Sequence, residues 1–564
     1  MLIGIDLGTT NSLAAYFDGE KPVLIPNRLG EALTPSVVSV DKDGTVLVGR
    51  AAKERAMLDP FCSAAVFKRA MGTDKEFELS GKKFKAVELS SLVLRSLKED
   101  AEAFLGQPVD EAIISVPAYF NDLQRKATRQ AGEMAGFGLE VKRIINEPTA
   151  AALAYGMGQK QSGRFLVFDL GGGTFDVSIL ELDAPVMEVH AIAGDNFLGG
   201  ENFTAVLMEL FLERTGLALE QLTYGELSHL AASAELAKVA FTTGAVVSMA
   251  CTVDGTEQRV DVTIADFEAA CEPLFEKLRK PIERSLRDAG LMVDDLDQIV
   301  LVGGATKASL VRRFVAKLFG RQPAAGVDPD LAVALGAAMQ CGMKQRNQAI
   351  KEIILTDVCP FTLGTSVVRS NGLFEESGFY CPIIERNTVI PVSRTETFYT
   401  ANDNQKQIRV DILQGESRLA RNNLYLGEVV VPVPQGPRGK ESVRVTYTYD
   451  INALLQVEVE VTSTGVKKQI ILQSGQNAMS DEEAAARMAE LAALKLSPRD
   501  QEENKLAMMR AERMYEESTG AVRRKVDGLI AAFDAALASQ DPLEAERGRK
   551  ALLEALDQLE EGAQ

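Results

Sequence analysis

Over residues 1 to about 350, short apolar runs alternate with segments whose apolar residues recur every three or four positions. The run 112–117 is followed by a helical pattern over 121–135, and the run 299–302 by one over 308–318. Such alternation is typical of α/β proteins, in which strands and helices succeed each other along the chain. We therefore expect an α/β domain with two lobes in the first part of the chain.

From about residue 359 onwards, the apolar positions recur every second residue, as in 407–412, 443–447 and 456–461. This period predicts strands with one buried and one exposed face, which suits antiparallel sheets. Glycine and proline at 434–439 supply turn residues between two of these strands. The segment predicts a β-sandwich of its own, which we place at residues 359–475.

The chain beyond Ser480 is rich in Ala, Leu, Glu and Arg. Ser480 precedes Glu483 by three residues, which forms a capping box, and Ser497 and Asp541 each precede a proline. These are signals for helix N-termini, because the capping side chain accepts a free amide and proline suits the first helical position. We therefore expect a small helical domain at residues 476–564.

The apolar segment 353–358 lies between the α/β region and the first period-two strands, with charged residues around it. Its length and composition fit one more sheet strand as well as a connection between domains, and periodicity alone does not decide. We place the α/β domain at residues 1–350 and the connecting segment at residues 351–358.

Composition narrows the function classes. The chain has 564 residues, of which 46% are hydrophobic, which predicts several packed domains rather than a disordered protein. Its 61 Lys and Arg against 80 Asp and Glu give a net charge of −19, which repels nucleic acid and anionic membranes. With no apolar run long enough to span a bilayer and no basic leader, we expect a soluble, cytosolic protein.

Cysteine and histidine content restricts the available chemistry. The six cysteines are far apart and form no Cys-x-x-Cys pair, so we interpret them as reduced thiols. His190 and His229 are the only histidines, which leaves little material for a His-ligated metal or a Ser-His-Asp centre. Catalysis must therefore depend on carboxylates, lysine, threonine hydroxyls, backbone amides and a hard cation.

Two glycine-rich segments share one pattern, in which a strand is followed by Asp-Leu-Gly and a Gly/Thr turn. The first contains residues 3–11 and the second residues 167–176. Glycine permits positive φ and close approach to a ligand, and successive amides in such turns form an anion nest. Two nests can hold a polyphosphate, and Asp6 and Asp169 at the strand ends offer oxygen ligands to Mg²⁺. No Walker A or Gly-x-Gly-x-x-Gly segment occurs.

Three further segments extend the predicted nucleotide site. Glu147 lies in a predicted loop before a helix of small residues, where a charge at a helix start is the simpler interpretation. Gly303 and Gly304 end a buried strand, where the backbone can pack against a flat base. Residues 327–330, Val-Asp-Pro-Asp, precede an alanine-rich helix and as a bare motif fit an ordinary helix cap.

These motifs together resemble the DnaK-type 70-kDa heat-shock chaperone family. The resemblance is carried by Asp-Leu-Gly-Thr-Thr-Asn-Ser at 6–12, residues 115–122, residues 146–152, Asp-Leu-Gly-Gly-Gly-Thr-Phe-Asp at 169–176 and Leu-Gln-Gly-Glu at 413–416. It extends from residue 1 to about 475. Phe-Lys-Arg-Ala-Met-Gly at 67–72 and a short helical tail with Pro-Arg-Asp at 498–500 are most similar to the HscC branch.

The resemblance implies an ATPase that hydrolyses ATP to ADP and phosphate with Mg²⁺, and with K⁺ as a second candidate ion. Asp6, Glu147, Asp169 and Asp176 would surround Mg²⁺ and the attacking water, largely through solvent, and Lys68 would position that water. The implied catalytic residues are Lys68, Glu147, Asp169, Thr174 and Asp176, and the implied nucleotide-binding residues are Asp6, Gly8, Thr9, Thr10, Asn11, Gly171, Gly172, Gly173, Glu235, Lys238, Thr242, Gly303, Gly304, Lys307 and Asp330.

The same resemblance implies coupling between the nucleotide and a peptide cleft. Pro117 and Arg125 would relay the nucleotide state to a hydrophobic linker, and the cleft would bind extended apolar peptide through main-chain hydrogen bonds and one pocket under Ile408. The implied linker residues are Ile353, Ile354, Leu355, Asp357 and Val358, and the cleft residues are Phe398, Ala401, Gln405 and Ile408.

The sequence also departs from the family pattern. Val239 stands where a family arginine often lies over the adenine. Lys307 replaces a second family arginine and could cover part of the ring. The segment 370–377 is longer than usual and acidic, which would shift peptide preference toward basic sequences. The tail ends without the acidic motif that some relatives use to bind helical-repeat cochaperones.

Three functions remain to be weighed. We favour an ATP-driven chaperone with an actin-like two-lobed ATPase, a β-sandwich and a short helical lid. Its expected partners are unfolded polypeptides and a J-domain cochaperone, with the exchange factor open, and we expect a monomer. A sugar-type small-molecule kinase shares paired phosphate hairpins, and an actin-like filament protein shares the lobes. Neither rival accounts for the period-two strands or the linker.

Overall fold

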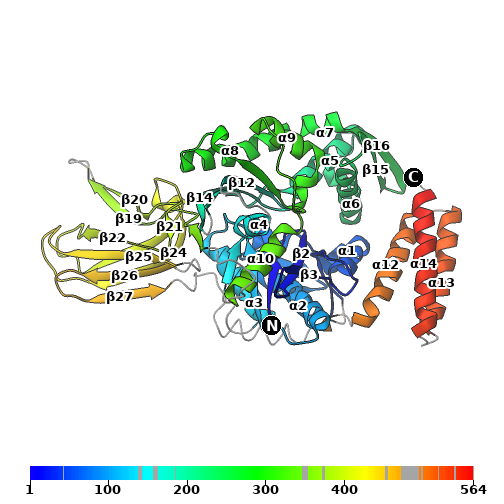
Figure 1. Ribbon diagram of the computed structural model, residues 1–564, viewed down its shortest axis with the longest axis horizontal. Coiled ribbons are helices and arrows are strands. Elements are labelled where there is room, and N and C mark those ends of the chain that lie inside the picture. Colours follow the sequence, from blue (N-terminus) through cyan, green and yellow to red (C-terminus); the bar gives the residue numbers. More distant parts are fainter. Residues whose placement is uncertain are drawn as a thin grey trace.

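The computed structural model describes residues 1–564 apart from 42–43, 138–142, 157–162, 184–185, 346–353, 371–374, 451–454, 472–494, 497–498, 519, 539–541 and 563–564. An α/β body forms the middle of the molecule, with a strand-rich part at one end and three long helices at the other (Figure 1). These three parts correspond to the three patterns along the sequence, with the part that comes first in the chain in the middle.

The first large sheet of the α/β body has the strand order β11-β10-β1-β2-β3. β10 is parallel to β1 and to β11, whereas β2 returns antiparallel to β1 through a tight hairpin. Its strands are β1 (Leu2–Asp6), β2 (Asn11–Phe17), β3 (Pro22–Ile25), β10 (Glu111–Val116) and β11 (Arg143–Asn146), with the short β4 (Thr34–Pro35) paired to β2.

The second large sheet repeats this arrangement. Its order is β17-β12-β13-β14-β18-β21, with β17 parallel to β12 and β13 antiparallel to β12 through the second glycine-rich hairpin. The strands are β12 (Gly163–Leu170), β13 (Phe175–Asp183), β14 (Val186–Asp195), β17 (Gln298–Val302), β18 (Ile354–Val358) and β21 (Val389–Ile390). The repeated hairpin motif in the sequence thus corresponds to equivalent positions in two sheets.

Two small-residue helices, α4 (Glu147–Gly156) and α10 (Ala332–Lys344), pack against each other between the sheets. One hydrophobic cluster contains Val167 of the second sheet, Ile113 of the first and Ala337 of α10. A side chain at Gly336 would collide with the Ala150 carbonyl, so this close helix contact requires glycine. The two helices therefore join the two sheets through one shared hydrophobic cluster.

Smaller elements complete the α/β body. The helices are α1 (Arg50–Leu58), α2 (Ala86–Leu105), α3 (Asp122–Met134), α5 (Gly200–Thr215), α6 (Tyr224–Ala240), α7 (Ile264–Ala270), α8 (Glu272–Ala289) and α9 (Ser309–Phe319). The remaining strands are β5 (Val38–Val40), β6 (Thr45–Val48), β7 (Ser63–Ala64), β8 (Glu76–Leu79), β9 (Lys82–Lys85), β15 (Val246–Val253) and β16 (Thr256–Thr263).

The segment for which periodicity left two interpretations forms strand β18. Its first residues pair in parallel with β14, as Leu355 does with Met187, and its last two residues pair with β21. Leu355 packs against the hydrophobic cluster between the sheets, and Val358 is buried in it. The segment is therefore a sheet strand that also joins the α/β body to the strand-rich part.

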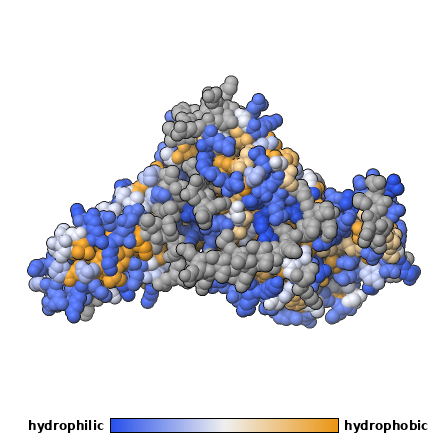
Figure 2. Space-filling view, turned by 90° about the horizontal axis from the view of Figure 1, so that it is seen from below, coloured by the Kyte–Doolittle hydropathy of each residue, from blue (hydrophilic) through white to orange (hydrophobic). Residues whose placement is uncertain are grey.

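Two four-stranded antiparallel sheets enclose one core in the strand-rich part. Alternate residues of β25 enter this core, including Val443, Val445, Tyr447 and Tyr449, as the period of two predicts. One sheet contains β20 (Glu375–Ile384), β19 (Leu363–Ser370), β23 (Gln407–Gln414) and β24 (Leu424–Pro432), and the other β22 (Val392–Tyr399), β25 (Ser442–Tyr449), β26 (Leu455–Val461) and β27 (Lys467–Ile471). Figure 2 shows a group of hydrophobic residues, in orange, on the surface of the strand-rich end.

The C-terminal helices are α12 (Arg499–Glu517), α13 (Gly520–Ala538) and α14 (Pro542–Gly562). The starts predicted after Ser497 and Asp541 agree with α12 and α14, whereas the start at Ser480 lies outside the described residues. No cap signal predicted α13, which is held by the core around Phe533. None of the helices in the described ranges has the length and low polarity that crossing a bilayer requires.

The C-terminal part contacts the α/β body at α1. Arg513 of α12 forms an ion pair of 2.9 Å with Glu54, and Met509 packs against a small cluster that includes Ala51. The short strand β28 (Lys495–Leu496) pairs in parallel with β6. The helices therefore lie beside the α/β body in this structure, at the end opposite the strand-rich part (Figure 1).

Candidate functional site

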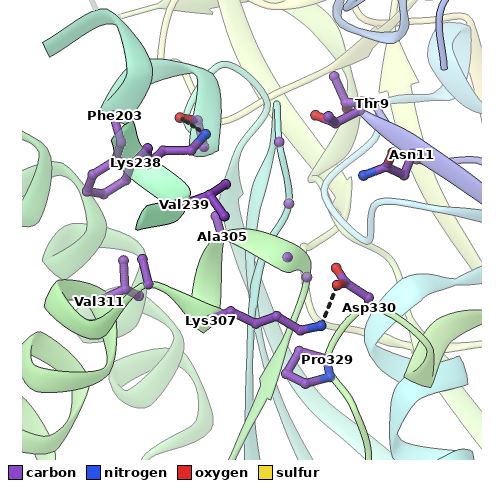
Figure 3. Close-up of a pocket in the computed structure, with 18 of the residues that line it drawn as sticks. Thr9, Asn11, Phe203, Lys238, Val239, Ala305, Lys307, Val311, Pro329 and Asp330 are labelled. Carbon is purple, nitrogen blue, oxygen red and sulfur yellow. Dashed lines mark hydrogen bonds and ion pairs between the residues drawn. The ribbon is translucent and has the colours of Figure 1, made fainter. Parts of the chain in front are cut away.

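A cavity of about 680 Å³ lies where the two glycine-rich hairpins meet. Figure 3 shows Thr9 and Asn11 on one side of it and Lys238, Val239 and Lys307 on the other. The predicted residues in its wall are Asp6, Gly8, Thr9, Thr10, Asn11, Lys68, Glu147, Asp169, Gly171, Gly172, Thr174, Glu235, Lys238, Thr242, Gly303, Gly304, Lys307 and Asp330. Sequence motifs from across the first 330 residues thus converge on one space.

Close approach, and not backbone strain, explains the hairpin glycines. A side chain at Gly172 would overlap the Thr10 hydroxyl, and one at Gly173 would lie 2.5 Å from Thr9 Cγ2. Gly8 and residues 171–173 do not have φ in the left-handed region. That conformation occurs instead at Gly303, where φ is 82°. The hairpins of the two sheets therefore touch each other, with backbone amides at the cavity.

Four carboxylates lie close enough to one another to interact, and three of them line the cavity. Asp169 and Asp176 are direct cross-strand partners on β12 and β13, and Asp6 ends β1. Glu147 is the first residue of α4, and not part of a loop as its sequence context predicts. Asp176 does not line the cavity wall directly, because its Oδ1 accepts the Tyr119 amide at 3.1 Å and the side chain is buried.

Lys68 provides the positive charge among these carboxylates. It lies in the 3₁₀ turn Phe67–Ala70, and its Nζ is 2.8 Å from Glu147 Oε1. Both side chains are buried, and the ammonium also lies over the Phe120 ring at 5.6 Å. Lys68, which the sequence motif predicts as a site residue, is therefore buried at the cavity, although most lysines are exposed to solvent.

Burial and mutual repulsion raise the pKa values of the acidic residues. The pKa of Asp6 and that of Asp176 rise from 3.8 to about 7, and the pKa of Asp169 rises well above its usual value. Loss of hydration is the largest cause, and the charge of Glu147 comes next. Such a cluster gains most from a cation, which would offset both causes.

The donor set fits Mg²⁺. Among the described residues, Asp169 Oδ2 and Asp176 Oδ2 are buried without a hydrogen-bond partner. Within the same ranges, no three acidic, His or Cys side chains are close enough to hold a metal ion directly. Mg²⁺ commonly keeps several waters and takes one or two carboxylates, so a largely water-mediated site at Asp6 and Asp169 agrees with this geometry.

Helix α6 and the turn after β17 form the opposite wall. Lys238 Nζ is bound by Glu235 at 2.6 Å and by the Gly200 carbonyl at 3.1 Å, which places the pair at the cavity edge. Lys307 is directed to Asp328 and Asp330, at 2.7 and 2.5 Å. Its ammonium is therefore held by these two carboxylates at the cavity wall (Figure 3).

Motif reasoning missed the apolar part of the wall. Leu13, Leu33, Phe203, Leu310 and Val311 line the cavity. In the sequence, each of them is indistinguishable from an ordinary core residue, because every folded domain has apolar residues on its strands and helices. No short pattern marks them, and only the folded arrangement shows that they face the cavity.

The predicted relay residues lie between the cavity and the strand-rich part. Pro117 is buried after β10, and Arg125 donates hydrogen bonds to the carbonyls of Ala118 and Phe120, at 2.8 and 3.0 Å. The neighbouring Asp122 accepts the Tyr449 hydroxyl at 3.1 Å. Burial raises the pKa of Asp122 to about 6. The loop that Arg125 holds therefore contacts both regions.

Further contacts join the same two regions. Asp357 of β18 accepts the Asn146 amide at 2.6 Å. Arg386 forms a two-pronged pair with Asp288 of α8 at 2.8 and 3.0 Å, and Asn387 binds the same carboxylate. Sequence reasoning did not find Asp288, Arg386 or Asn387, because the partners are about a hundred residues apart in the chain.

The residues expected to line a peptide cleft lie around β22 and β23. Ile408 is in the core between the two sheets, and Phe398 packs partly against it. Gln405 accepts the Ala401 amide at 2.9 Å and donates to the Gln407 carbonyl at 2.8 Å. Of the predicted acidic segment, residues 371–374 lie outside the described residues, as does Ile353 of the predicted linker.

The family described as "Hsp70 protein" matches residues 2–78 and 73–561 of this chain. The chain therefore belongs to the Hsp70 family. Among its relatives, the "Chaperone protein DnaK" of Thermotoga neapolitana is 42% identical over 500 residues, which cover 86% of this chain and 82% of the relative. This relationship does not support the small-molecule kinase.

Proposed function

We propose that this Hsp70 couples ATP hydrolysis in the cavity between the two hairpins to peptide binding in the strand-rich part. As a member of its family, the chain is a molecular chaperone and an ATPase. The observation that supports the location is the convergence of two glycine hairpins, Lys68 and the carboxylates of Asp6, Glu147 and Asp169 on one cavity. Phosphoryl transfer suits these groups, since it requires mainly positioning and charge neutralisation.

The nucleotide would be ATP or ADP with Mg²⁺, with K⁺ as a second candidate ion. Amides of the hairpins at Thr9 and Gly172 would hold phosphates, while Gly303, Lys238 and Asp330 would surround the nucleoside. Asp6 and Asp169 would hold Mg²⁺ largely through water, and the bound cation would neutralise phosphate charge. Lys68, with Glu147, would orient the attacking water, and Asp176 and Thr174 would complete the group.

We further propose the domain division 1–350, 351–358, 359–475 and 476–564, with an actin-like two-lobed ATPase, a linker, a β-sandwich and a helical lid. Two sheets with equivalent hairpins support the first assignment, and two sheets around one core support the third. The peptide site would use Phe398, Ala401, Gln405 and Ile408 for extended apolar segments.

Partners and location follow the same proposal. Clients would be unfolded polypeptides, and a J-domain cochaperone would stimulate hydrolysis, with the exchange factor still to be identified. We expect a monomer. All six cysteines are free thiols, which suits a cytoplasmic location. Assignment to the HscC branch remains a prediction from residues 67–72 and the short tail.

Peptide binding with and without ATP tests the proposal. A peptide array, followed by fluorescence anisotropy of the strongest sequence, should show tighter binding with ADP than with ATP. Hydrolysis should be measured on the same preparation, with the Asp169→Asn protein as a control that keeps the shape of the site. Equal peptide affinity in both nucleotide states, in a protein that hydrolyses ATP, would contradict the coupling but not the ATPase site.

A further inference from the structure

The residue after Lys68 crosses from one half of the α/β body to the other. Arg69 belongs to the 3₁₀ turn Phe67–Ala70 beside the first sheet. Its Nε donates to the Gly173 carbonyl at 2.9 Å, and its Nη2 donates to Asn202 Oδ1 at 2.8 Å. Gly173 is in the second phosphate hairpin and Asn202 is in α5. One guanidinium therefore joins the segment of Lys68 to two elements of the second half.

The acceptors fix this guanidinium in one plane. Asn202 Oδ1 also accepts the Gly199 amide at 2.9 Å at the start of α5, so its orientation is already set. The planar fork of arginine can satisfy two acceptors at a fixed angle, whereas lysine presents a single ammonium on a flexible stem. Burial lowers the pKa of Arg69, and the nearby charges of Glu201 and Asp195 act against this shift.

Gly173 lies in close contact with both the first hairpin and Arg69. A side chain at this position would lie 2.5 Å from Thr9 Cγ2 and 3.0 Å from Arg69 Nε. The first hairpin and Arg69 thus contact the same residue of the second hairpin. Glycine is required there by space alone, since its φ is not in the left-handed region.

The turn that carries Lys68 and Arg69 begins from a strained residue. Val66 has a φ of 56°, a conformation that is costly for a β-branched side chain. Such strain persists where surrounding contacts determine the backbone, and it is enriched at functional sites. The two hydrogen bonds of Arg69 are contacts of this kind, and they lie immediately after the catalytic lysine in the chain.

We propose that Arg69 is a positioning residue, which holds the second phosphate hairpin in register with Lys68 across the two halves. The inference rests on the proposed function, since it concerns the hydrolysis step in the same cavity. Arg69 does not line the cavity and acts through the Gly173 backbone and Asn202. Small displacements of positioned groups can lower rates by about 100-fold, whereas the other phosphate contacts would retain binding.

Single-turnover hydrolysis of ATP by the full chain tests this role. Arg69→Ala should lower the rate by about 10- to 100-fold, with the Kd for ATP changed by less than about threefold. Arg69→Lys should not recover the rate, because it cannot make both hydrogen bonds in one plane. Arg321→Ala is the matched control, since Arg321 also binds backbone carbonyls, those of Leu296 and Val293, outside the cavity wall.

The outcomes are distinct. A rate near that of the parent in Arg69→Ala would overturn the proposal, and full recovery in Arg69→Lys would show that charge alone suffices. Equal rate losses in Arg69→Ala and Arg321→Ala, in proportion to their thermal unfolding midpoints, would show a merely structural role. If Arg69→Ala does not fold, the hydrolysis rate of Arg69→Lys still tests the proposal. A low rate would show that both hydrogen bonds are needed, and a parental rate would show that the positive charge alone suffices. Absence of hydrolysis by the parent protein would contradict the proposed function instead.

Discussion

Lys68 Nζ and Glu147 Oε1 form a buried ion pair of 2.8 Å between segments that are 79 residues apart. The pair has two consequences. It neutralises one carboxylate of the acidic cluster, and it holds the ammonium at the wall of the cavity that the two hairpins also line. Lys68 and Glu147 are therefore expected to act as a unit, so that a change in either one affects both charge and geometry.

Replacement of Lys68 by alanine should leave ATP binding and remove most hydrolysis. Loss of one group that stabilises the transition state commonly costs about 3 to 4 kcal/mol, or two to three decades in rate. Single-turnover measurement at saturating ATP gives this rate. The exposed Lys82 provides the control substitution, and a rate within a few fold of the parent would remove Lys68 from the catalytic residues.

The same substitution should also lower the free energy of unfolding. Glu147 would then be buried without its partner, and breaking a buried pair commonly costs about 3 kcal/mol or more. In the double variant Lys68→Met with Glu147→Gln, both charges are absent, so stability should largely recover while hydrolysis stays low. Denaturant unfolding of the parent, Lys68→Ala and the double variant separates the two roles. Recovery of both properties would contradict a catalytic role for the pair.

The sequence predicted the hairpins well because their chemistry is local. Asp169, the glycines and Asp176 fall within eight residues, so a strand and turn pattern places them together before any tertiary contact is known. Glu147 was predicted in a loop but is the first residue of α4, because this helix begins about one turn before its run of small residues. The boundary of a helix depends on what the helix packs against, and α10 is that partner.

Contacts between distant segments could not be predicted in this way. The pairing of Lys307 with Asp328 and Asp330, and of Arg386 with Asp288, depends on how separate elements meet. Charged residues of this kind are mostly exposed and unpaired, so their sequence context gives no signal. Helix α13 was missed for a similar reason, since the core around Phe533 stabilises it and no cap marks its start.

The affinity for Mg²⁺ and nucleotide should rise with pH. In the cation-free protein, the pKa of Asp6 and that of Asp176 are about 7, so the folded chain retains protons that the unfolded chain releases near 3.8. The folded, cation-free state therefore loses stability as pH rises from about 4 to about 7. Cation binding requires the ionised groups, so it should release protons below pH 7.

Calorimetry of Mg·ADP binding in two buffers of different ionisation enthalpy measures this release. We expect proton release at pH 6.5 and little at pH 8.5. Asp176→Asn removes one titrating group and should reduce the release, which separates the contribution of the protein from that of the nucleotide phosphates. A proton release that does not change between these pH values, in the parent and in Asp176→Asn, would show that the carboxylates are already ionised.

Charged substitutions in β18 should abolish the effect of ATP on peptide affinity. Leu355 packs against the cluster between the sheets and Val358 is buried in it, so aspartate at both positions would disfavour pairing of β18 with β14. A coupling of about 1 to 3 kcal/mol corresponds to about a 5- to 150-fold difference in affinity between nucleotide states. Fluorescence anisotropy with ATP and with ADP should show this difference only in the parent.

The control for β18 is Val466→Asp, at an exposed turn residue of the strand-rich part. It adds a charge of the same kind outside the segment and should keep the full difference between nucleotide states. Peptide affinity in ADP should be similar in all variants, because Leu355 and Val358 are not part of the core of the strand-rich part. Coupling that persists in the β18 variant would mean that the contacts of Asp288 and Asp122 suffice without the strand.

Substitution of Val239 by arginine should slow the release of nucleotide. Val239 lines the cavity on α6 and its side chain is 60% exposed, so a longer side chain can extend over the base. A guanidinium over an aromatic ring contributes about 0.5 to 2 kcal/mol through stacking and cation–π attraction. Since the hairpins are unchanged, the effect should appear mainly in the off-rate, by about 3- to 30-fold.

We expect Lys307 to compensate for Val239 only in part, because its ammonium is already held by Asp328 and Asp330. Leu236→Arg is the matched control, since Leu236 is one turn earlier on α6, is 71% exposed and is not in the cavity wall. Stopped-flow release of a fluorescent ADP analogue should be slower in Val239→Arg and unchanged in Leu236→Arg. Equal slowing in both variants would point to a general effect of positive charge on α6, and an unchanged rate in both would mean that the native wall already holds the base as tightly as arginine does.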